Sequence, residues 1–73
     1  MNKLIIWLIR KKFNLKKDEP FQFANQKDKT TYYTFTDNNI IKYYSNGKKR
    51  RSGVSLNYLL DNECKIIRGY FNL

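Results

Sequence analysis

The chain carries two tight-turn signals between strand-forming segments, and these constrain its fold more than any other feature. Thr31 to Asp37 is rich in Thr, Tyr and Phe, and Ile40 to Ser45 is β-branched and aromatic, as is typical of strands. Asn38-Asn39 lies between the two runs, and Asn46-Gly47 follows the second. Both pairs suit tight hairpins, and Asn-Gly is the strongest short hairpin signal. With a third strand from Lys48 to about Ser52, these segments predict a three-stranded antiparallel meander.

The lengths of these turns decide which side chains share a face of the sheet. Two-residue turns place Phe35 opposite Lys42 and Tyr44 opposite Lys49. The first face then holds Tyr33, Phe35, Ile40, Lys42, Tyr44, Lys49 and Arg51. The second face holds Tyr32, Thr34, Thr36, Ile41, Tyr43, Ser45, Lys48 and Arg50. Because the first face has more apolar surface, we expect it to face the core, with its basic residues reaching to the rim.

The second face is the predicted partner-binding surface. Tyr32 and Tyr43 would lie beside Lys48 and Arg50, and such a surface suits nucleic acid because bases stack on rings while cations meet phosphates. The basic run 48–51 is the densest positive charge and would supply phosphate contacts. The candidate partner-binding residues are Tyr32, Tyr43, Lys48, Lys49, Arg50 and Arg51. The alternative is that these charges only protect an edge strand from aggregation.

The N-terminal segment combines six apolar residues, 4–9, with the basic cluster Arg10 to Lys12. A membrane span needs about 20 apolar residues and a secretory signal about 7–15 with a cleavage site, so we expect a cytoplasmic protein without a transmembrane segment. Phe13 and Leu15 continue the apolar spacing, which favours a helix over residues 3–15, with a buried strand as the alternative. A membrane-surface helix is a third interpretation. The candidate dimer-interface residues are Leu4, Ile5, Ile6, Trp7 and Ile9.

The remaining segments complete an α+β fold. Residues 54–62 are predicted to form a short helix with Ser55 as its N-cap. Residues 64–71 resemble a closing strand, and the alternation over 21–23 allows another short strand. We therefore expect one small domain over residues 1–73, built from an N-terminal helix, the three-stranded antiparallel meander, the short helix and the closing strand.

The composition limits the chemistry of the chain. Fifteen Lys and Arg stand against six Asp and Glu, for a formal charge of +9, which favours an anionic partner. The chain has no His, and Cys64 is its single Cys, so we expect neither a metal site nor an internal disulfide. No paired carboxylates or Gly-rich loop indicate catalysis, so we predict a non-enzymatic protein without cofactors. Because a core this small is often supported by a second subunit, we also predict a homodimer.

The chain is rich in Asn, Lys, Ile, Tyr and Phe, residues whose codons are mostly A- and T-rich. In size, charge and this composition it resembles small phage-encoded host-takeover proteins, which bind and block host replication, transcription or defence machinery. The resemblance implies an inhibitor that occupies the binding surface of an acidic or nucleic-acid-handling host protein. The DNA replication sliding clamp is one such target. Leu56-Asn-Tyr-Leu-Leu60 and Tyr70-Phe-Asn-Leu73 are similar to clamp-binding peptides in their clustered Leu and aromatics, but lack the Gln. Direct binding of DNA or RNA by the basic-aromatic sheet face is the alternative.

Overall fold

The structure, a computed structural model, describes residues 2–68 of the 73-residue chain. Its elements are α1 (Lys3–Phe13), β1 (Phe21–Phe23), β2 (Tyr32–Phe35), β3 (Ile40–Tyr43), β4 (Lys49–Arg51), α2 (Leu56–Leu60) and β5 (Ile66–Arg68). This order confirms the α+β prediction of an N-terminal helix, a meander, a short helix and a closing strand. The end of the predicted closing strand, beyond residue 68, lies outside the described residues.

The first element is a helix, so the prediction of a helix over residues 3–15 is confirmed and the strand alternative is wrong. The helix begins where Asn2 Oδ1 accepts a hydrogen bond from the Ile5 N–H at 2.9 Å. It ends at Asn14, whose left-handed backbone (φ 57°) turns the chain so that the Leu15 N–H donates to the Arg10 carbonyl at 2.9 Å. Three basic residues in the last turn complement the helix dipole. Within the described part of the chain, no helix is long and apolar enough to cross a membrane.

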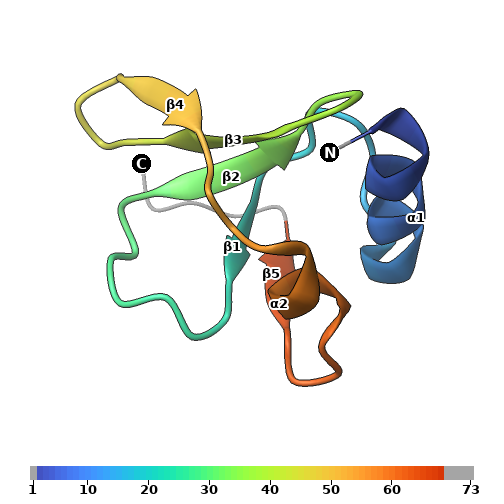
Figure 1. The fold of residues 1–73 in the computed structure, drawn as a ribbon. Coiled ribbons are helices and arrows are strands. Elements are labelled where there is room, and N and C mark those ends of the chain that lie inside the picture. Colours follow the sequence, from blue (N-terminus) through green and yellow to red (C-terminus); the bar gives the residue numbers. More distant parts are fainter. Residues whose placement is uncertain (1, 69–73) are drawn as a thin grey trace.

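The five strands form one sheet in the order β4-β3-β2-β1-β5, with every neighbouring pair antiparallel. β2, β3 and β4 are the predicted meander, and β4 is its outer edge. β1 and β5 run across the direction of the meander strands, so the sheet is strongly curved (Figure 1). α1 and α2 lie beside this curved sheet, and their apolar sides meet the same core.

The core lies between the two helices and the concave side of the sheet. The largest fully buried side chains are Phe21, Phe35, Ile6, Ile9 and Leu59. Ile6 and Ile9 are only 0% and 1% exposed, so these two predicted dimer-interface residues instead belong to the chain's own core. Because all six residues of the run are apolar, the sequence alone does not show which of them face the core. Only the helical periodicity divides the run into a buried side and an exposed side.

The first hairpin has a two-residue loop, as predicted, but one residue earlier in the chain. Phe35 pairs with Ile40 rather than with Lys42, and the Thr36 N–H donates to the Asn39 carbonyl at 2.9 Å. Asp37 and Asn38 therefore form the loop, in place of Asn38 and Asn39. Because the observed partner differs from the predicted one by an even number of residues, the face assignments of β2 and β3 still hold.

The second hairpin contradicts the predicted faces. Tyr43 pairs with Lys49, and the Tyr44 N–H donates to the Lys48 carbonyl at 2.8 Å. The loop is thus the three residues 45–47, and Gly47 has the left-handed φ of +86° that a three-residue hairpin requires at this position. One extra loop residue exchanges the two faces of β4, so Lys49, not Lys48, shares a face with Tyr43.

α2 is joined to α1 by the side chain of Lys12. Ser55 caps α2 as predicted, since its Oγ accepts from the Tyr58 N–H at 3.1 Å. Lys12 Nζ donates to the carbonyls of Leu59 at 2.6 Å and Asp61 at 3.1 Å, which are at the C-terminal end of α2. Lys12 is therefore a structural residue, in contrast to its basic neighbours.

We expect Lys12→Met to lower the free energy of unfolding by about 1–2 kcal/mol, because two carbonyls lose a charged donor while the apolar stem is kept. Urea unfolding followed by circular dichroism measures the loss. Lys11→Met is the matched control, since Lys11 is exposed and next in sequence. Equal stability of the two variants would show that the contact of Lys12 with α2 contributes nothing.

Candidate partner-binding surfaces

The six predicted partner-binding residues lie around β4, but the structure divides them between two faces. By strand register, Lys49 lies opposite Tyr43, and Arg51 lies opposite Ile41. We call the face formed by Tyr32, Ile41, Tyr43, Lys49 and Arg51 the meander surface. Arg50 pairs with Lys42 and lies on the other face, where its guanidinium is 6.0 Å from the ring centroid of Tyr44.

This division corrects the predicted surface. Lys48 and Arg50 were expected beside Tyr32 and Tyr43, but they line a hollow with Tyr44, Asn46 and Lys49 on the other face. Lys49 and Arg50 also border the depression next to Tyr43, whereas Lys48 does not. The predicted core-facing position of Lys49 and Arg51 is likewise wrong. Both are exposed, so their charges meet solvent directly.

The two tyrosines of the meander surface stack on each other. Tyr32 and Tyr43 are paired across β2 and β3, with ring centroids 4.8 Å apart and planes inclined by 5°. Such a cross-strand aromatic pair stabilises the hairpin. Both residues are half-buried, and each ring uses one side in the stack, so a base or side chain has access only to the remaining surface.

A shallow depression of about 500 Å³ adjoins the stacked rings. Its lining combines apolar and basic side chains: Asp18, Thr36, Ile41, Tyr43, Lys49, Arg50 and Arg51. Asp18 is the single carboxylate in this lining against three cations. The depression therefore suits a group that is apolar at one end and negatively charged at the other.

The basic charge of β4 has no carboxylate partner among the described residues. The two ion pairs found there are Lys17–Asp37 at 3.3 Å and Arg68–Glu19 at 3.0 Å. Glu19 also accepts a hydrogen bond from the Lys16 N–H, and this bond, with a smaller contribution from Arg68, lowers the pKa of Glu19. Glu19 is therefore already bound to groups other than β4. The cations of β4 thus remain available to an external anion.

The outward side of α1 carries a second exposed surface. Leu4, Trp7 and Leu8 are 64%, 47% and 52% exposed, and we call them the α1 stripe. Leu4 and Trp7 were predicted interface residues, whereas Leu8 was not. The spacing i, i+3, i+4 places all three on one side of a helix, so this periodicity was the signal that could have identified Leu8.

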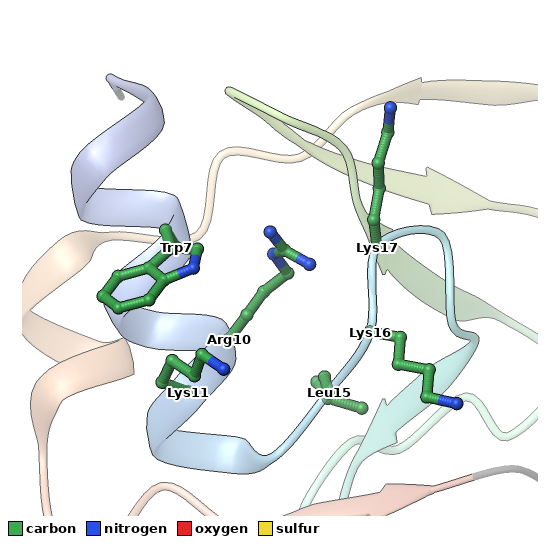
Figure 2. Close-up of a pocket in the computed structure, with 6 residues that line it drawn as sticks. All are labelled: Trp7, Arg10, Lys11, Leu15, Lys16 and Lys17. Atoms are coloured by element: carbon green, nitrogen blue, oxygen red, sulfur yellow. The ribbon is translucent and has the colours of Figure 1, made fainter.

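A third feature, which we call the α1 hollow, lies where α1 turns toward β1. It encloses about 200 Å³ and is lined by Trp7, Arg10, Lys11, Leu15, Lys16 and Lys17. Figure 2 shows the Arg10 guanidinium between the helix and the segment carrying Lys17, with Trp7 on the helix side. The basic residues of the hollow are close together in the sequence, but the hollow itself forms only because the chain turns at Asn14.

Cys64 lies apart from these surfaces. It is buried in the core beside α2, and burial raises the pKa of its thiol. A protonated, buried thiol is a poor nucleophile, which makes its role that of a packing residue.

Comparisons of the chain with protein-family models, with curated proteins and with solved structures gave no match. The candidate functional surfaces of the chain are therefore the meander surface, the α1 stripe and the α1 hollow.

Proposed function

We propose that the chain is a non-enzymatic binding protein that inhibits a nucleic-acid-handling host protein by occupying its binding surface. One observation carries this proposal: the edge strand β4 presents three exposed basic side chains, without a described carboxylate partner, beside a depression lined by Ile41 and Tyr43. An acidic rim around an apolar anchor is the complementary surface on a partner.

We also propose which class of host protein is the target. Proteins that handle nucleic acid bind the polyanion with basic surfaces, so a chain with a formal charge of +9 would bind an acidic face elsewhere on such a protein. In line with the sequence resemblance, we propose a phage-encoded protein acting in the host cytoplasm, with the DNA replication sliding clamp as the example target. Of the two clamp-like segments, Leu56–Leu60 forms α2, where Leu59 is buried and Leu60 is exposed. Leu60 is thus the residue of that segment most open to a partner.

Direct nucleic-acid binding is the second candidate, and the stacked tyrosines favour it. Tyr32 and Tyr43 share the meander surface with Lys49 and Arg51, so rings and cations lie on one face. That arrangement suits a single strand, whose phosphates would meet the cations while a base packs on the tyrosines.

Capture from host lysate separates the two candidates. Tagged protein is incubated with lysate before and after nuclease treatment, and retained proteins are identified by mass spectrometry. We expect the same acidic protein to be retained in both samples and to be lost when Lys49 and Arg51 are changed to Ser. Loss of all retained proteins after nuclease treatment would favour direct nucleic-acid binding.

We also propose a homodimer formed through the outward side of α1. Leu4 and Trp7, joined by the partly buried Ile5, remain from the predicted interface, and Leu8 extends it. Burying such a stripe against a second copy removes apolar surface from water.

Light scattering is expected to show a dimer at high micromolar concentration. The double change Leu4→Ser and Leu8→Ser should shift the mass to that of a monomer without altering the circular dichroism spectrum. Leu60→Ser, at another exposed leucine, is the control and should leave the dimer intact. A monomeric native chain at high micromolar concentration would contradict this proposal.

A further inference from the structure

We propose that the α1 hollow binds the phosphate group of a nucleotide, free or at the end of a nucleic-acid strand, with the base lying against Trp7. This site is separate from β4 and does not depend on the protein contact proposed there. It shares Trp7 with the proposed dimer surface, so a base on Trp7 and a second copy of the chain would compete for that side chain. Its lining brings basic side chains from two segments together, Arg10 and Lys11 from α1 and Lys17 from the segment that follows. The Lys17 ammonium extends away from the other two (Figure 2) and is paired with Asp37.

The hydrogen bonding of Arg10 supports a phosphate site most strongly. Its Nε is buried and has no hydrogen-bond partner within the described residues. A buried donor without an acceptor costs free energy, and a small rotation of the guanidinium toward a phosphate oxygen in the hollow would supply that acceptor. The planar guanidinium is also the side chain best suited to paired hydrogen bonds with phosphate.

The charges around the hollow favour a strongly anionic ligand. Lys11 Nζ lies 5.4 Å from the Trp7 ring centroid, held over an aromatic face rather than by a carboxylate. Asp37, which lines an adjoining hollow with Arg10, is paired with Lys17 at 3.3 Å between half-exposed side chains. An exposed pair of this kind is weak, so a phosphate could compete for Lys17.

The size of the hollow limits what it encloses. About 200 Å³ is less than the roughly 300–1,000 Å³ of pockets that surround a whole drug-sized ligand. The hollow therefore suits a phosphate group, while the remainder of the ligand lies outside. Trp7 borders this opening and is half-exposed, so its indole offers a surface for a base.

Trp7 is the single tryptophan of the chain, so its fluorescence reports on this site. The protein is titrated with ADP, with a short 5′-phosphorylated DNA strand, with the same strand lacking that phosphate and with anionic phospholipid vesicles. We expect a saturable change with ADP or with the phosphorylated strand, and reversal by inorganic pyrophosphate. The ligand that saturates at the lower concentration identifies the source of the phosphate.

Three variants locate the site. Arg10→Gln and Lys11→Gln should each weaken binding about tenfold, as expected for loss of a charge-assisted hydrogen bond. Lys11 is exposed, so its variant keeps the test valid even if Arg10→Gln impairs folding. Lys27→Gln removes the same charge from an exposed loop outside the hollow and should weaken binding less than twofold.

Three results would overturn the proposal. The first is the absence of a saturable response to both ADP and the phosphorylated strand at millimolar concentration. The second is equal weakening by Lys27→Gln and Lys11→Gln, which would mean diffuse attraction to the whole charged surface. The third is a Trp7 response confined to anionic phospholipid vesicles, which would assign the α1 stripe and hollow to membrane binding.

Discussion

Replacing Phe21 by Ala is expected to leave most of the protein unfolded at 25 °C. Phe21 is completely buried, and its ring centroid lies 5.2 Å from that of Phe35 and 5.4 Å from that of Phe23. Its strand, β1, is also the link between β5 and the meander. Truncating a buried Phe typically costs about 3–5 kcal/mol, and a core of this size rarely supplies more than about 3–5 kcal/mol in total.

Circular dichroism and urea unfolding measure this effect. Leu60→Ala is the control, because a 55% exposed leucine should change the free energy of unfolding by less than about 0.5 kcal/mol. A Phe21→Ala variant that unfolds at the same urea concentration as the native chain would contradict the described core.

Changing Lys48, Lys49, Arg50 and Arg51 together to Ser is expected to remove most partner binding while the fold persists. All four side chains are exposed, and exposed substitutions usually alter stability little. Each exposed ion pair with a partner contributes about 0.5 kcal/mol, so the loss of four, about 2 kcal/mol in total, should weaken binding about thirty-fold. Calorimetry with the captured partner measures the change, and circular dichroism verifies the fold.

The two faces of β4 allow a matched comparison. Arg51→Ser alters the meander surface alone, whereas Lys48→Ser removes the same charge from the hollow on the other face alone. We expect Arg51→Ser to cause the larger loss of affinity. Equal losses would mean that the charge acts without a defined contact surface, and unchanged affinity in all variants would assign the run to protection of the sheet edge.

The sequence predicted the elements of the fold better than their register. Strand composition and turn residues identified the meander, and Ser55 identified the start of α2. However, Asn46-Gly47 fits both a two-residue and a three-residue hairpin, and composition does not distinguish them. That one-residue difference moved Lys49 and Arg51 onto the face of Tyr43.

Parts of the candidate sites depended on contacts that sequence spacing does not contain. Trp7 and Lys17 approach the same hollow only because the chain reverses at Asn14. Similarly, Lys12 reaches the carbonyl of Leu59, 47 positions away in sequence. In contrast, the exposed stripe of α1 follows from helical periodicity once the helix is assigned, so Leu8 could have been predicted.

The dependence of affinity on salt tests the central claim most directly. Affinity is measured between 50 and 200 mM salt, both for the captured partner protein and for random-sequence DNA. We predict a modest decrease with the protein partner, because an apolar centre carries most of the binding energy and charge acts mainly on the association rate. With DNA, a steep response is a fall in log affinity of about 0.9 per phosphate contact for each tenfold increase in salt, or about a thousandfold for six contacts between 50 and 200 mM. Such a response, with no protein retained from nuclease-treated lysate, would contradict the account.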